Sequence, residues 1–106
     1  MRNEYKTAWH IRQYVKRELM DYKNNKKMLQ SYKGNTRGLI LAFQRITQIE
    51  NVLNRLNRED REAAEIIFID QYTQAGAEVA KGLSKRAYYN VMNKVIYLTA
   101  IEMGLM

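Results

Sequence analysis

Side chains that suit hydrogen bonding to nucleic acid lie close together near the C-terminal end of this 106-residue sequence. Arg86 has the planar donor pair that binds a guanine edge at two atoms, and Asn90 can bind an adenine edge in the same way. Lys85 and Lys94 suit phosphate oxygens, and Tyr89 suits either a phosphate or the methyl group of thymine. These residue types indicate contacts with double-stranded DNA.

The spacing of these side chains places them on one face of a helix. At about 100° per residue, polar and apolar residues separate into two halves of the helical circumference. The polar half contains Lys85, Arg86, Tyr89, Asn90, Asn93, Lys94 and Tyr97. The apolar half contains Ala87, Tyr88, Val91, Met92, Val95 and Leu98. Such a polar half fits a DNA groove, and it equally fits the ordinary solvated face of an amphipathic helix.

A turn and a helix cap directly precede this helix. Gly82 can adopt the left-handed conformation that ends one helix, and the Ser84 hydroxyl can cap the next. The sequence therefore predicts a short segment over 75–81, a turn, and a long helix from Lys85 to about Met103. A helix-turn-helix of this form places its second helix in the DNA major groove. The predicted DNA-binding residues are Ser84, Lys85, Arg86, Tyr89, Asn90, Asn93 and Lys94.

The N-terminal half predicts two helices and a connecting turn. The absence of proline and the abundance of Lys, Glu, Arg, Leu, Met and Ala favour helix throughout the chain. Apolar residues at every third or fourth position predict a helix over about 3–32, in which Asn24-Asn25 is a candidate bend or break. A glycine-containing turn follows over 33–38. The next helix carries a seam typical of a coiled coil or helical hairpin, formed by Leu39, Ala42, Ile46, Ile49, Leu53 and Leu56.

A further helix is predicted over about 58–72. Asn57 can cap it, and Asp60 stands three residues later in the place of a capping-box acid. Its apolar residues cover more than one face, which predicts a central helix packed on two sides. We therefore expect one all-α domain over 1–106, with an N-terminal helical hairpin or coiled coil over 1–57 and a C-terminal helix-turn-helix-like part over 58–106.

The composition argues against enzymatic chemistry. The chain has no cysteine and a single histidine, His10, which excludes disulfides and thiolates and leaves no His-paired metal site or triad. We expect no catalytic residue, no metal and no cofactor. No stretch approaches the ~18 apolar residues of a membrane span, so we expect a cytoplasmic protein that does not bind membranes.

The positive charge is concentrated at one end of the chain. The formal net charge is +7, and residues 1–37 contain ten Lys and Arg against three acidic residues. Residues 38–70 sum to −2 and residues 71–106 to +2. The predicted recognition helix therefore carries little of the charge surplus, and the basic N-terminal residues suit either non-specific DNA attraction or a docking surface.

Several segments, in order along most of the chain, resemble the ArpU/RinA-type phage transcriptional regulators. They span 17–23, 45–53, 56–61, 84–90 and 94–105. The resemblance implies a small helical phage or prophage protein whose C-terminal helix-turn-helix is similar to region four of bacterial sigma factors. It also implies activation of late or packaging genes. Carried over, Ser84 caps the recognition helix, Lys85, Arg86, Tyr89 and Asn90 face the groove, and Val91, Val95 and Leu98 pack against the central helix.

Two functional hypotheses follow. The first is a DNA-binding transcriptional regulator in the bacterial host cytoplasm, whose C-terminal helix reads the major groove while its N-terminal helices form a homodimer or meet RNA polymerase. The second is a non-enzymatic helical adaptor or structural protein that binds a protein partner through its coiled-coil seam. A steep loss of affinity with salt distinguishes the first from the second.

Overall fold

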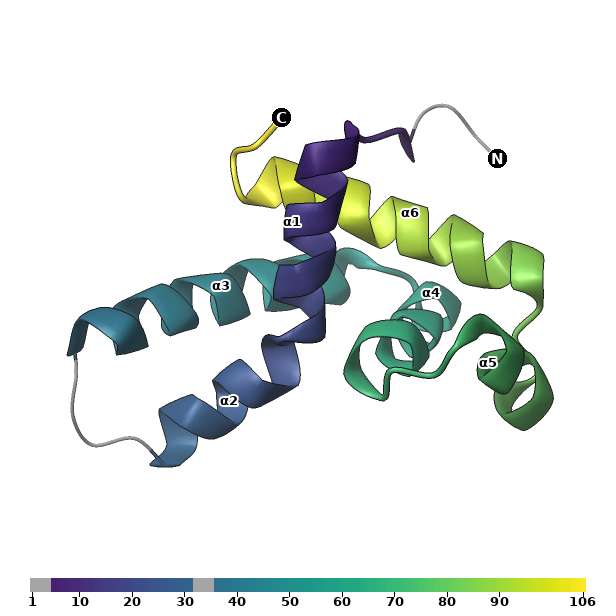
Figure 1. The fold of residues 1–106 in the computed structure, drawn as a ribbon, viewed down its shortest axis with the longest axis horizontal. Coiled ribbons are helices and arrows are strands. Elements are labelled where there is room, and N and C mark those ends of the chain that lie inside the picture. The colour runs from purple at the N-terminus through teal and green to yellow at the C-terminus, as the bar shows by residue number, and fades with distance from the viewer. Residues whose placement is uncertain (1–4, 32–35) are drawn as a thin grey trace.

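The computed structural model describes residues 5–31 and 36–106, and within them every regular element is helical. The predicted all-α fold class is confirmed (Figure 1). In chain order the elements are α1 (Trp9–Met20), α2 (Tyr22–Ser31), α3 (Thr36–Arg55), α4 (Arg58–Ala64), the π-helical turn η2 (Glu65–Ile69), α5 (Gln74–Lys81) and α6 (Lys85–Glu102). Residues 33–35 of the predicted turn over 33–38 lie outside the described residues, and for 36–38 the prediction is wrong because they form the first turn of α3.

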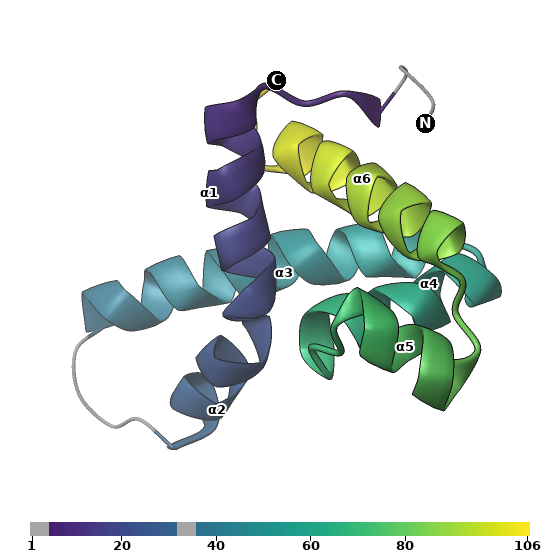
Figure 2. The same ribbon diagram turned by 45° about the vertical axis from the view of Figure 1, so that its right-hand side comes forward.

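The predicted first helix is divided at Asp21, and the suggested break at Asn24-Asn25 is wrong because both asparagines lie inside α2. The two parts take different courses, with α1 crossing α6 and α2 lying beside α3 (Figures 1 and 2). At the division, the Gln71 side-chain amide donates to the Met20 carbonyl at 2.8 Å. That donor is distant in the sequence, so local propensity did not indicate where the helix would bend.

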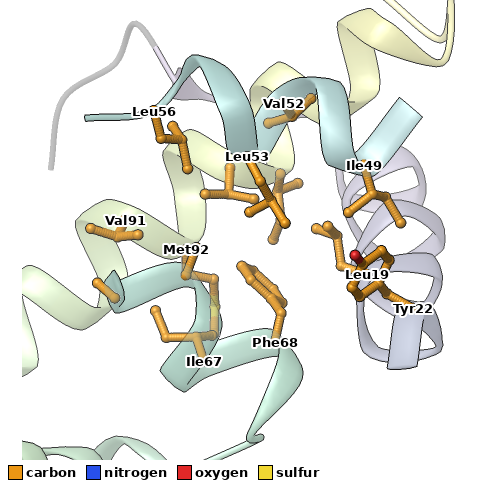
Figure 3. Packing of buried hydrophobic residues seen from close by; sticks show 14 of the residues in the cluster. Leu19, Tyr22, Ile49, Val52, Leu53, Leu56, Ile67, Phe68, Val91 and Met92 are labelled. Atoms are coloured by element: carbon orange, nitrogen blue, oxygen red, sulfur yellow. The ribbon is translucent and has the colours of Figure 1, made fainter. Parts of the chain in front are cut away.

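The seam of α3 packs inside the chain's own core. Five of its six residues are buried, namely Ala42, Ile46, Ile49, Leu53 and, just after the helix, Leu56, while Leu39 is half-buried. The helix contacts α2, α4 and α6. Figure 3 shows part of this core, in which α3 residues meet side chains from the helices around them. The regular spacing of the seam therefore serves intramolecular packing, and a second chain is not needed to cover it.

The central helix forms as predicted at its start and ends earlier than predicted. The Asn57 side chain accepts a hydrogen bond from the Asp60 amide at 2.8 Å, which confirms the cap. The helix widens into η2 and stops at Ile69, because Gln71 adopts a left-handed conformation with φ 59°. Ala63, Ala64, Ile67 and Phe68 are buried. Because α4 and η2 contact helices from both halves of the chain, the predicted central position is confirmed.

Candidate nucleic-acid interface

A three-residue turn joins α5 to α6 and fixes where α6 begins. Gly82 closes α5 with φ 68°, and the amides of Gly82 and Leu83 donate to the Glu78 and Ala77 carbonyls at 3.2 Å. Ser84 then caps α6, since its hydroxyl oxygen accepts from the Ala87 amide at 3.1 Å. The predicted turn and both predicted cap roles are confirmed.

Tyr88 holds the first turns of α6 from the core side. Its hydroxyl donates to the Tyr72 carbonyl at 3.0 Å, and only 6% of the residue is exposed. Burial, followed by the nearby Tyr89 phenol, raises the pKa of Tyr88, so the hydroxyl keeps its proton and remains a donor at neutral pH. The neighbouring ring of Tyr89 packs edge-on against it at 5.2 Å and stays on the exposed side.

The exposed side of these first turns lines an open groove of about 640 Å³. Lys85, Arg86, Tyr89 and Asn90 all lie along it, and all four are exposed. The structure therefore brings together, beside one groove, the four residues predicted to face DNA from the first two turns. Their guanidinium, ammonium, amide and phenol groups supply the donors that base edges and phosphates accept.

Two predicted site residues have other roles. Asn93 also lines the groove, but it is buried at 6% exposure and its side-chain oxygen accepts a hydrogen bond from the Arg12 guanidinium of α1. Lys94 forms an ion pair with Asp60 at 2.8 Å, and both side chains are largely covered, at 29% and 23% exposure. The helical wheel placed both on the polar half, but α1 and α4 pack across the second half of α6.

Sequence reasoning missed three residues at this groove. Tyr5 lines it from the N-terminal segment and packs edge-on against Tyr97, with ring centroids 5.6 Å apart. Asp60 lines it from α4, and Arg12 supports it through Asn93. Asp60 was expected only as an acid near a helix start. Nothing in the local sequence indicates its pairing with Lys94, which is 34 positions away.

The groove offers donors but no evident metal chemistry. Within the described parts of the chain, no three His, Asp or Glu side chains gather closely enough to hold a metal ion. His10 and Trp9 are exposed on α1 and do not line the groove. Because Asp60 and Lys94 neutralise each other, the exposed cations Lys85 and Arg86 set the sign of the potential along this wall.

No protein-family model matches the chain, and comparisons with curated proteins and with solved structures also give no match. None of the helices in the described residues is long and apolar enough to cross a membrane.

Proposed function

We propose that this chain is a sequence-specific DNA-binding transcriptional regulator that inserts the first two turns of α6 into the major groove. The observation that carries the proposal is the cluster of Lys85, Arg86, Tyr89 and Asn90 beside one groove, directly after a capped three-residue turn. In helix-turn-helix proteins, the N-terminal residues of the second helix contact the base edges. The polar side chains of the first two turns of α6 are exposed, whereas α1 and α4 contact the helix further along.

Each side chain has a distinct role in this proposal. Arg86 reads guanine and Asn90 reads adenine, because each has a pair of groups that match two atoms of the base edge. Lys85 contacts a phosphate, and Tyr89 contacts a phosphate or a thymine methyl group. Ser84 and Asn93 position the helix, the first as its cap and the second through Arg12.

The biological setting is proposed from the resemblance to ArpU/RinA-type regulators. It implies a phage or prophage protein that activates late or packaging genes in the host cytoplasm, with RNA polymerase as a further partner. The strongly basic residues 1–37 are consistent with contact to a polyanion or an acidic protein surface. The proposal includes a homodimer, which would form through a surface other than the α3 seam because that seam packs in the chain's own core.

The adaptor alternative has less support. It requires the α3 seam to bind a partner, but Ile46, Ile49 and Leu53 are at most 6% exposed and belong to the main core. A partner could reach them only if the chain first separated α3 from α2 and α6, which would expose much of the apolar interior.

Selection from a randomised duplex pool, followed by fluorescence anisotropy on the selected duplex, tests the proposal. Arg86→Ala and Asn90→Ala should each reduce the preference for the selected sequence by roughly 5- to 150-fold, which corresponds to about 1–3 kcal/mol per bidentate contact. The controls are Arg17→Ala and Gln13→Ala, which remove exposed α1 side chains of similar type. The proposal fails if the wild-type chain binds no duplex at low salt, or if the controls lose as much preference as the α6 variants.

A further inference from the structure

A second groove, of about 620 Å³, lies where α2, α3 and α4–η2 meet. Lys23, Lys26 and Lys27 line one wall from α2, a helix that contains no acidic residue. Arg61 lines the opposite wall from α4. Figures 1 and 2 show α2 running beside α3 on the side of the molecule away from α6. None of these cations belongs to the groove beside α6.

The second groove carries a surplus of positive charge. Its described lining has four cationic side chains and two carboxylates, those of Glu50 and Glu65. Glu50 accepts a hydrogen bond from the Tyr22 hydroxyl at 2.7 Å and pairs with Lys26 at 3.1 Å, while Glu65 pairs with Arg61 at 3.5 Å. Both carboxylates are therefore already engaged by groups of the groove itself. An anionic ligand would meet a net attractive potential there.

The exposed side chains of this groove favour phosphates over an apolar peptide. Lys23, Lys27 and Gln30 are exposed donors of the kinds that bind phosphate oxygens. The apolar floor is largely covered, since Tyr22 is 7% exposed, Leu53 is 6% exposed and Ile69 is half-buried. A helical peptide that docks in a groove needs open apolar pockets for its anchor side chains, and this floor does not provide them.

The helix α4 lies between the two grooves, because its neighbouring residues Asp60 and Arg61 line one groove each. The two grooves therefore border the same helix, and a duplex bound at α6 would reach the second groove where its sugar–phosphate backbone continues past α4.

We infer that the groove between α2, α3 and α4 is a second DNA contact, which binds backbone phosphates without reading sequence. The inference rests on the proposed function of α6. Base contacts then come from the first two turns of α6, in a part of the chain, residues 71–106, whose net charge is only +2. Much of the salt-dependent affinity comes from the lysines of α2. This division gives a defined role to Lys23, Lys26 and Lys27, three of the ten cationic residues in 1–37.

The test compares Lys23→Gln/Lys27→Gln with the charge-matched control Lys16→Gln/Arg17→Gln on α1. Anisotropy measures the affinity of each protein for the selected duplex and a scrambled duplex between 50 and 200 mM salt. Each lost phosphate contact should reduce the slope of log affinity against log salt by about 0.9. We expect the α2 variant to lose about 1–2 in slope and to weaken equally on both duplexes, with its sequence preference unchanged. The control should keep a slope close to that of the wild type.

The outcomes separate this inference from the proposed function. If the wild-type chain binds no DNA, the proposed function fails and this inference fails with it. If the wild type binds the selected duplex and the α2 variant keeps the wild-type slope, only the second contact is overturned. Equal slope losses in both double variants would also overturn it, since they would reflect overall charge.

Poly-glutamate is a further probe. If it binds the wild type more tightly than scrambled DNA, and the α2 variant loses that binding, the groove takes acidic polypeptide and the phosphate assignment is wrong.

Discussion

Arg12 of α1 donates a hydrogen bond to the side-chain oxygen of Asn93 in α6, a residue 81 positions later in the sequence. A second guanidinium nitrogen of Arg12 contacts the Met92 sulfur at 3.6 Å. Asn93 is buried, so this contact joins the first helix to the last at a polar point inside their interface. The orientation of α6, and with it the direction of Arg86 and Asn90, therefore depends in part on α1.

Arg12→Ala should destabilise the fold by about 1–2 kcal/mol, because a partly buried hydrogen bond from a charged donor is lost. The measurement is the free energy of unfolding in urea. Gln13→Ala, which removes an exposed α1 side chain, should change it by less than about 0.5 kcal/mol. Equal unfolding free energies for the two variants would show that the Arg12–Asn93 contact does not stabilise the protein.

Asp60→Asn should strengthen binding to any duplex. The substitution removes a carboxylate that lines the groove and its ion pair with Lys94, while the backbone amide that Asn57 caps is retained. We expect a several-fold gain in affinity at low salt that shrinks as salt rises, with unchanged sequence preference. The matched control is Glu59→Gln, an exposed acid that does not line the groove. The same gain in the control would attribute the effect to net charge alone.

Gly82→Ala should destabilise the turn between α5 and α6 by about 1 kcal/mol, because the left-handed backbone at φ 68° disfavours a Cβ atom. No atom lies within 4 Å of the added methyl group, so the penalty is conformational. Gly38→Ala is the informative counterpart, since Gly38 lies within α3 and also has open space around it. There the expected sign is reversed, with a gain of about 0.5–1 kcal/mol, and urea unfolding measures both variants.

The stability contributed by Glu50 should depend on pH below neutrality. The hydrogen bond from Tyr22, assisted by Lys26, lowers the pKa of Glu50 below its ordinary value of 4.5. A carboxyl group with a lowered folded-state pKa stabilises the protein above its unfolded-state value, and that contribution is lost as the pH falls through the folded-state pKa. Glu50→Gln should therefore lower stability at pH 7, and its difference from the wild type should shrink as the pH falls through the folded-state pKa of Glu50.

Tyr22→Phe checks the cause, because it removes the hydroxyl that donates to Glu50 and keeps the ring. In urea unfolding, the free-energy difference between Tyr22→Phe and Tyr22→Phe/Glu50→Gln should change less from pH 3 to pH 7 than the difference between the wild type and Glu50→Gln. If the difference is as large as that between the wild type and Glu50→Gln, the Tyr22 hydroxyl does not set the pKa of Glu50.

Features that act within a few residues of the chain could be predicted from the sequence. Asn57 and Ser84 each cap a helix by accepting from an amide three positions later, and Gly82 needs only its own backbone freedom. The residue type at each of these positions is therefore enough to indicate the cap or the turn. For the same reason, the exposed first turns of α6 could be placed on one face before the structure was known.

Features that depend on distant partners could not be predicted in this way. The spacing of the α3 seam indicates that one face is apolar, but it does not say whether the same chain or another covers that face. Asn93 and Lys94 share the polar half of α6 with Asn90 and line the same groove, but partners on α1 and α4 engage their side chains. Charge segregation along the chain likewise gave no indication that α2 would border a groove shared with α4.

The hydrogen bond from Gln71 to the Met20 carbonyl bears on the order in which the chain is made and folded. The donor lies 51 residues after its acceptor, on the left-handed residue that follows η2. A nascent chain emerging from the ribosome therefore contains the sequences of α1, α2 and α3 before it contains this donor to the junction of the first two helices. In the full chain, Gln71→Ala should make the α1–α2 junction more mobile in nuclear magnetic resonance relaxation than it is in the wild type.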